Sequence, residues 1–115
     1  MSIACVGDSL TEGTDHERPE ASYPGRLQAM LDQESPGQYI VVNLGSSGAT
    51  ARRRGDIPYW ASSQFRALQS VRWDLIIVML GTNDAVDQHY ANCEPLAWLI
   101  DLVTAMRLKR PGALQ

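Results

Sequence analysis

Three short apolar segments alternate with segments of helical periodicity along this chain of 115 residues. The apolar segments are 3–7, 39–44 and 74–80, and the helical patterns are 24–33, 60–70 and 92–109. The continuous apolar run at 75–80 is typical of a strand that is covered on both faces. Alternation of strand and helix at this spacing predicts right-handed βαβ units and a parallel sheet. We therefore expect an α/β fold in a single domain, residues 1–115.

Local signals indicate where the helices begin and end. Ser22 is a candidate N-cap with Pro24 in the first helical turn, and the sequence 35–37, Ser-Pro-Gly, ends that helix. The polar stretch 10–22 is expected to be a surface loop. Pro111 is expected to end the long helical pattern that runs to residue 109.

Composition excludes several classes of protein. A hydrophobic content of 44%, a charged content of 20% and a net charge of −3 are ordinary for a globular protein and give no basic surface for nucleic acid. The longest apolar run is far shorter than the ~20 residues that span a bilayer, and no signal peptide is expected ahead of the first strand. Cys5 and Cys93 do not form a disulfide framework, so we expect a cytoplasmic setting.

Polar motifs follow each of the three expected strands. They are Gly7-Asp8-Ser9-Leu10, Asn43-Leu44-Gly45 and Gly81-Thr82-Asn83-Asp84. Ligands of open α/β sheets bind beyond the carboxyl ends of the strands. The three motifs therefore predict one site at that edge of the sheet.

The residue types in these motifs fit the hydrolysis of an ester. Ser9 is the candidate nucleophile, and attack by its hydroxyl places negative charge on the carbonyl oxygen. Backbone N–H groups of Ser9 and Gly45 and the side-chain amide of Asn83 are candidate donors to that oxyanion. One such donor lowers the barrier by roughly 3–4 kcal/mol. Asp8, beside Ser9, is expected to stabilise the turn rather than to act as a catalytic acid.

The ordered set of motifs resembles the SGNH hydrolases, also called the GDSL esterase/lipase family. The matching blocks are 7–13, 42–50 and 79–84, with Tyr23-Pro24 ahead of the first helix. The resemblance implies a three-layer, flavodoxin-like sandwich with the first strand between the second and third. It also implies an acyl-serine mechanism on a small ester substrate, with Ser9, Gly45 and Asn83 in the roles given above. No cofactor is expected.

The family's last block, Asp-x-x-His, does not occur in this sequence. We therefore expect the N-terminal portion of the family fold, truncated to about three strands, with impaired activity. His89 is the better candidate for a substitute base and His16 the weaker one, although both are more typical of surface histidines. Two scattered histidines and two cysteines give no metal-binding spacing, and no P-loop is present.

Two further hypotheses follow from the shortened sheet. The outer edge of the strand at 75–80 would have no partner, which favours a homodimer through this edge. The alternative to an esterase is a catalytically inactive fragment that acts as a binding or assembly module. The arginines at 52–54 are expected to form a solvated loop rather than an anion site.

Overall fold

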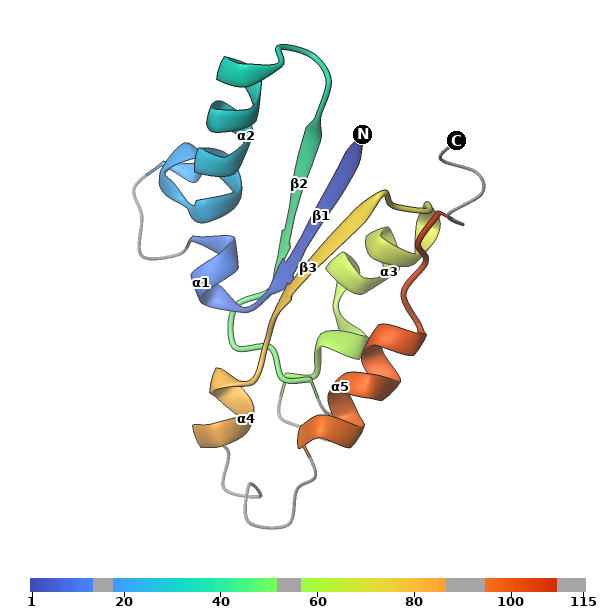
Figure 1. Cartoon of the computed structure of the whole chain (residues 1–115). Helices are drawn as coiled ribbons and strands as arrows, with labels where there is room; N and C mark the ends of the chain where they lie inside the picture. Colours follow the sequence, from blue (N-terminus) through green and yellow to red (C-terminus); the bar gives the residue numbers. More distant parts are fainter. Residues whose placement is uncertain (14–17, 52–56, 87–94, 110–115) are drawn as a thin grey trace.

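The computed structural model describes residues 1–13, 18–51, 57–86 and 95–109 of the chain. Along the sequence the elements are β1 (Ser2–Gly7), α1 (Ser9–Glu12), η1 (Pro19–Ala21), α2 (Tyr23–Glu34), β2 (Ile40–Gly45), η2 (Tyr59–Ala61), α3 (Ser63–Ser70), β3 (Leu75–Met79), α4 (Thr82–Val86) and α5 (Pro95–Thr104). Strands and helices alternate, as the sequence pattern predicts (Figure 1).

The three strands form one parallel sheet in the order β2-β1-β3. In this register Cys5 of β1 lies opposite both Asn43 and Ile77. Five of the six residues of β1 are buried, whereas the flanking strands are more exposed. The predicted α/β class and the central position of the first strand are therefore confirmed.

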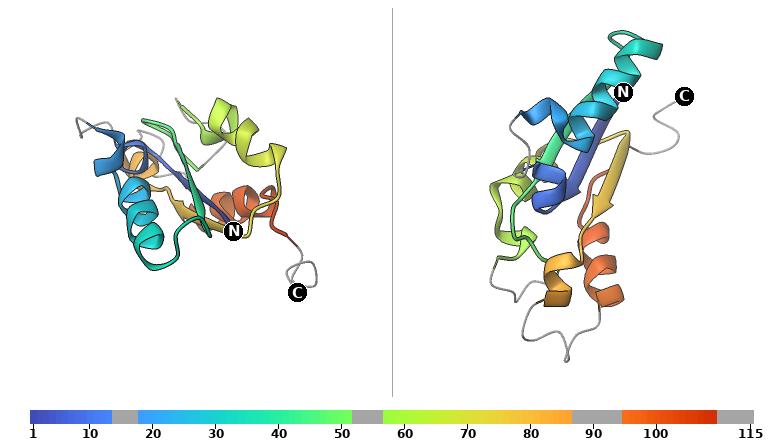
Figure 2. Two further views of the ribbon diagram at one scale, coloured as in Figure 1. Left: turned by 90° about the horizontal axis from the view of Figure 1, so that it is seen from above. Right: turned by 90° about the vertical axis from the view of Figure 1, so that its left-hand side faces the viewer.

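Helices cover both faces of this sheet (Figure 2). Helices α1 and α2 lie on one face, and α3 and α5 lie on the other. The largest core cluster joins Ala4 and Val6 of β1 to Phe65 and Leu68 of α3 and to Leu102 of α5. The result is the three-layer arrangement that the sequence predicts.

Capping residues define the ends of the main helices. Helix α2 follows Ser22, has Pro24 in its first turn and gives way to Ser35, as predicted. Helix α3 begins where the Ser62 hydroxyl accepts a hydrogen bond from the Phe65 N–H at 3.0 Å. Over the described ranges, no helix is both long enough and apolar enough to cross a membrane.

Part of the predicted loop 10–22 is helical, which corrects the sequence-based expectation. Helix α1 begins directly after Asp8, whose carboxylate accepts a hydrogen bond from the Leu10 N–H at 3.0 Å. The single turns α1 and η1 are too short and too polar to produce an apolar period, so the pattern cannot reveal them. The same reason applies to α4, which the sequence analysis also does not predict.

The last helix is shorter than its apolar pattern indicates. Helix α5 ends at Thr104, and the following segment turns toward the sheet. There the Arg107 carbonyl accepts a hydrogen bond from the Trp73 N–H, and the Lys109 N–H donates to the Trp73 carbonyl, each at 2.9 Å. Trp73 and Leu108 thus form an isolated parallel bridge next to β3, and the backbone of residues 107–109 cannot also be helical. The predicted helix start at 92–94 lies outside the described residues.

A carboxylate joins three segments at the amino ends of the strands. Asp74 Oδ2 accepts hydrogen bonds from the Ser2 N–H at 2.7 Å, the Ser2 hydroxyl at 3.2 Å and the Lys109 ammonium at 3.1 Å. The Ser2 N–H and the nearby Lys109 charge hold the pKa of the Asp74 carboxyl below its usual value. This network stabilises the folded state only while Asp74 is ionised.

We expect Asp74→Asn to lower stability at neutral pH and to have less effect in acid. Because the folded pKa is depressed, the contribution of Asp74 is complete above the unfolded value of ~3.9 and is lost as the pH falls through the folded pKa. Urea midpoints of both proteins at pH 7, 4, 3 and 2 measure this change. The exposed Asp101→Asn variant is the matched control. A difference between wild type and Asp74→Asn that is as large at pH 2 as at pH 7 would contradict this assignment.

Candidate active site

Ser9 is the first residue of α1 and lies at the carboxyl end of β1. The buried Asp8 caps the helix, and the Ser9 carbonyl accepts a hydrogen bond from the Gly13 N–H at 2.8 Å. The first N–H groups of a helix have no partner within the helix. The Ser9 side chain is half-buried, so its hydroxyl and N–H lie at the surface end of a fixed turn.

Asn83, in the motif after β3, contacts the turn after β1 and the loop after β2. Its side-chain amide donates hydrogen bonds to the Ala49 carbonyl at 3.0 Å and to Asp8 Oδ2 at 3.4 Å. The 3.4 Å contact is long for a hydrogen bond and therefore weak. The three predicted motifs thus meet at one edge of the sheet, with Asn83 linked to the turn that carries Ser9.

Gly45 has a packing role in this structure. A Cβ atom at this position would lie 2.3 Å from the Glu12 backbone nitrogen, so only glycine allows α1 to approach β2 this closely. The Gly45 N–H donates to Asn43 Oδ1 at 2.9 Å. The N–H group that the sequence analysis assigns to the oxyanion is therefore occupied here by a neighbouring side chain.

Gly48, in the same block, is a donor that the sequence analysis does not consider. Its φ of +78° is a conformation that favours glycine. Within the part of the chain that the structure describes, no acceptor is found for its N–H. Because the next residue, Ala49, accepts the Asn83 amide, Gly48 lies directly beside the site. The glycine within Ser-Ser-Gly-Ala-Thr (46–50) is the sequence signal that could have identified it.

Two carboxylates hold the loop that carries Gly48. Glu12 Oε2 on α1 accepts a hydrogen bond from the Ser47 N–H at 2.9 Å. The buried Asp84 on α4 accepts one from the Ala51 N–H, also at 2.9 Å. Side chains from two helices therefore fix the loop relative to Ser9 and Asn83.

Two buried hydroxyls, Thr11 Oγ1 and the Tyr23 hydroxyl, make no hydrogen bond of standard geometry among the described residues. The Tyr23 hydroxyl lies near both Thr11 and the thiol of the buried Cys5. Burial raises the pKa of Tyr23 to about 12 and also raises the pKa of the Cys5 thiol. Burial therefore favours the neutral form of both groups.

No histidine is among the described residues of this site. His89, the predicted substitute base, and His16 both lie outside the described residues, as do Asp87 and the arginines 52–54. In the described ranges, no group of three or more His, Cys, Asp or Glu side chains could hold a metal ion.

Ser9 after β1 and Asn83 after β3 thus lie at the carboxyl edge of a parallel α/β sheet, where ligands of such sheets bind. The sequence profile of the GDSL-like lipase/acylhydrolase family matches residues 5–114. The chain therefore belongs to this family, and the resemblance stated from the motifs is confirmed.

The chain is similar to one known protein in sequence and to two solved structures in fold. It is 32% identical to an acetylxylan esterase of Xylanibacter ruminicola over 91 residues, which are 78% of this chain and 18% of that protein. A carbohydrate acetylesterase family member from Sinorhizobium meliloti superposes with a TM-score of 0.61 at 25% identity, covering 96% of this chain and 55% of that structure. A variant of the esterase AlinE4 superposes with the same TM-score at 23% identity, covering 90% of this chain and 52% of that structure. The chain thus spans about half the length of the two solved structures.

We expect Asp84→Ala to destabilise the site loop more than Asp84→Asn. Alanine leaves the Ala51 N–H buried without its acceptor, which costs about 1–3 kcal/mol, whereas asparagine keeps a side-chain oxygen. Urea unfolding gives the stability, and hydrogen exchange at Ala51 reports on the loop itself. The exposed Glu34→Ala variant is the control. Equal losses for the two Asp84 variants, with unchanged exchange at Ala51, would show that this hydrogen bond does not hold the loop.

Proposed function

We propose that this chain hydrolyses carboxylic esters through a covalent acyl-serine intermediate on Ser9. The observation that carries the proposal is the meeting of the three motifs, in which Asn83 is hydrogen-bonded to both Asp8 and Ala49 beside the turn that presents Ser9. Membership of the GDSL-like family gives independent support.

The reaction would proceed in two transfers of the acyl group. Ser9 Oγ attacks the ester carbonyl carbon and gives its proton to a base, and the carbonyl electron pair moves onto the oxygen. When the tetrahedral adduct collapses, the ester C–O bond breaks and the alcohol leaves with that proton. Water then repeats the attack on the acyl-serine, which releases the carboxylic acid and restores the Ser9 hydroxyl.

Three donors would surround the oxyanion. We assign the Ser9 N–H, the Asn83 amide and one backbone N–H from the loop after β2. The weak 3.4 Å contact to Asp8 can be exchanged for the substrate oxygen, so one Asn83 N–H is free to turn. For the backbone donor we favour Gly48 over Gly45, since Gly45 would first have to release Asn43.

The base has to come from outside the described residues. His89 is our first candidate and His16 the second, because these are the two histidines of the chain. In a serine hydrolase the loss of the histidine alone costs roughly 10⁶ in turnover. The oxyanion donors and substrate binding alone retain a residual ~10³-fold over water.

Acetylated carbohydrates are the substrate class that we place first. Two of the three relatives are named for the removal of acetyl groups from carbohydrates, one of them from xylan. Lipid esters, thioesters and aryl esters are the competing substrate classes. A synthetic acetyl ester tests ester hydrolysis without favouring any natural alcohol.

We expect the purified chain to hydrolyse p-nitrophenyl acetate and acetylated xylo-oligosaccharides, and Ser9→Ala to abolish both reactions. With a working histidine, the rate should rise with pH through an inflection near ~6.5, the ordinary value for imidazole. The assay covers pH 5 to 9 and includes His89→Gln and His16→Gln. Ser63→Ala, at an exposed serine on α3, is the matched control.

Each outcome of this assay is decisive for one part of the proposal. If the pH inflection is lost in His89→Gln but kept in His16→Gln, His89 is the base. If the rate depends on Ser9 but shows no inflection with pH, no histidine acts as the base. Catalysis would then come from the oxyanion donors. Equal rates for wild type and Ser9→Ala at every pH would refute the esterase proposal.

A second candidate function is a catalytically inactive binding or assembly module. It is favoured by the outer edge of β3, which has no strand partner among the described residues beyond the bridge at Trp73. Large apolar side chains are exposed on β3 and α5: Leu75 (46%), Met79 (42%), Ile100 (56%) and Val103 (49%). Unpaired apolar edges favour association with another strand, so we propose a homodimer through the strand at 75–80.

Ile77→Pro tests this dimer with little disturbance of the sheet. The Asp74 N–H bonds to the Ser2 carbonyl of β1, so the alternate residues Leu75, Ile77 and Met79 direct their N–H groups to the outer edge. Proline at position 77 therefore removes an outward donor, which is tolerated at an edge. Sedimentation velocity should show a dimer for wild type and for Ile77→Ala, but a monomer for Ile77→Pro with unchanged circular dichroism. A monomeric wild type at 100 μM would refute the dimer.

A further inference from the structure

Asn43 is the residue of the second motif to which the proposed mechanism gives no role. It lies on β2, and its exposed side chain joins the end of this strand to α1. The side-chain nitrogen Nδ2 donates hydrogen bonds to the Thr11 carbonyl at 2.9 Å and to the Glu12 carbonyl at 3.3 Å. The side-chain oxygen Oδ1 accepts a hydrogen bond from the Gly45 N–H at 2.9 Å. One carboxamide therefore bonds to two backbone carbonyls of α1 and to one backbone N–H of β2.

The chemistry of these three hydrogen bonds requires an amide. The last carbonyls of a helix have no partner within the helix, and α1 has only four residues. A carboxamide offers these carbonyls an N–H donor and at the same time offers the Gly45 N–H an acceptor oxygen. An ionised carboxylate of the same shape accepts hydrogen bonds but donates none. Aspartate at position 43 would thus keep the bond to Gly45 and lose the bonds to α1.

Gly45 limits the movement of α1 in the opposite direction. A Cβ atom at Gly45 would lie 2.3 Å from the Glu12 backbone nitrogen, so the backbone of α1 already lies against β2. The helix cannot move closer to the strand, and the hydrogen bonds of Asn43 resist movement away from it. Because Ser9 is the first residue of the same short helix, any shift of α1 also shifts Ser9.

The loop that carries Gly48 follows directly after β2. Gly45 is the last residue of the strand, and the Ser47 N–H donates to the Glu12 carboxylate at 2.9 Å. The position of this loop is therefore set by β2, whereas the position of Ser9 is set by α1. A change between the two elements alters the distance between the Ser9 N–H and the Gly48 N–H. Misplacement of reacting groups by about 1 Å costs roughly 10²-fold in rate.

We propose that Asn43 is a positioning residue for ester hydrolysis at Ser9. Its carboxamide fixes α1 against β2 and so sets the distance between the Ser9 N–H and the Gly48 N–H. Its hydrogen bonds go to backbone groups of these two elements, so it acts through them rather than on the ester. This inference rests on the proposed function, because the distance matters for catalysis only if both N–H groups bind the oxyanion.

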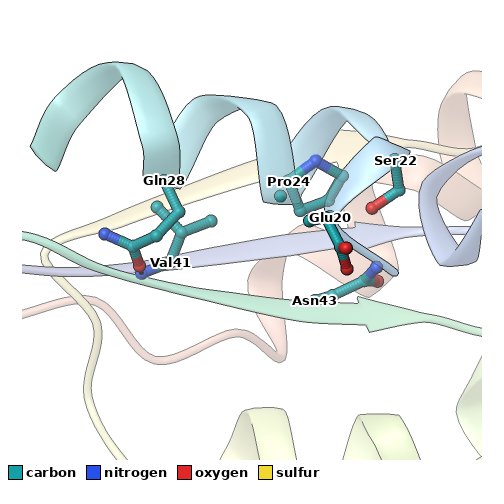
Figure 3. Close-up of a pocket in the computed structure, with 7 residues that line it drawn as sticks. Glu20, Ser22, Pro24, Gln28, Val41 and Asn43 are labelled. Carbon is teal, nitrogen blue, oxygen red and sulfur yellow. Dashed lines mark hydrogen bonds between the residues drawn. The ribbon is translucent and has the colours of Figure 1, made fainter. Parts of the chain in front are cut away.

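Gln28 on α2 is the matched control for Asn43. The two residues line a cavity of about 350 Å³ between α2 and β2, and Figure 3 shows them at opposite ends of it. The Gln28 carboxamide also bonds to backbone beside Asn43, donating to the Tyr39 carbonyl at 2.9 Å and accepting from the Val41 N–H at 2.7 Å. Among the described residues, no hydrogen bond joins Gln28 to α1. Gln28→Glu therefore makes the same chemical change near the same strand without touching α1.

The kinetics of p-nitrophenyl acetate hydrolysis test the catalytic consequence. At pH 8 the carboxyl groups introduced by Asn43→Asp and Gln28→Glu are ionised. We expect Asn43→Asp to lower kcat at least tenfold and to change KM less than twofold, because the interaction that is lost acts in the transition state. Gln28→Glu should change kcat less than twofold. Asn43→Ala and Gln28→Ala are a second, uncharged pair for which we expect the same result.

Backbone amide signals of the ¹⁵N-labelled chain give a readout that does not depend on catalysis. Both Asn43 variants should shift the Ser9 and Gly48 signals, and both Gln28 variants should leave them in place. If wild type and Ser9→Ala hydrolyse the ester equally, the proposed function fails, and these signals alone decide whether Asn43 positions Ser9.

Three results would overturn the inference. The first is a kcat that Asn43→Asp and Asn43→Ala retain, or that falls equally in the matching Gln28 variants. The second is a loss confined to KM. The third is that the Ser9 and Gly48 amide signals do not move in the Asn43 variants.

Discussion

Parallel pairing of β1 with both neighbouring strands is the constraint on which the rest of the molecule depends. Because β2 and β3 both run parallel to the central strand β1, their carboxyl ends lie at the same edge as its own. The lack of a side chain at Gly45 then allows α1 to pack against β2, since a Cβ there would collide with the Glu12 backbone. The position of Ser9 follows from these two conditions.

Once the strand ends meet, side chains fix the loops between them. Asn83 connects the end of β3 to the turn after β1 and to the loop after β2, while Glu12 and Asp84 hold that loop from two helices. The two carboxylates therefore hold backbone N–H groups of this loop, whereas the Asn83 amide holds its Ala49 carbonyl. Catalysis by oxyanion stabilisation depends on such preorganised donors.

The outer edges of β2 and β3 are covered by different kinds of hydrogen bond. On β2, Gln28 and Asn43 place carboxamides on outward backbone groups, which hinders continuous pairing with another strand. On β3, the one backbone pairing seen among the described residues of the outer edge is that of residues 107–109 with Trp73. Edge strands are common sites of association, and covering them with side chains restricts what can bind.

The apolar periods and the glycine-containing turns were sufficient to predict the three strands and their parallel pairing, and the family resemblance added the central position of β1. Periodicity could not reveal α1 and α4, because a single turn contains too few residues to show a period. It also extended the last helix through 107–109, whose backbone pairs instead with Trp73, a partner more than thirty residues away. Hydrogen-bond partners so distant in sequence are chosen by the packing of the sheet, so tertiary structure alone decided that Gly45 N–H is occupied, that Gly48 lies beside Asn83, and that Gln28 covers β2.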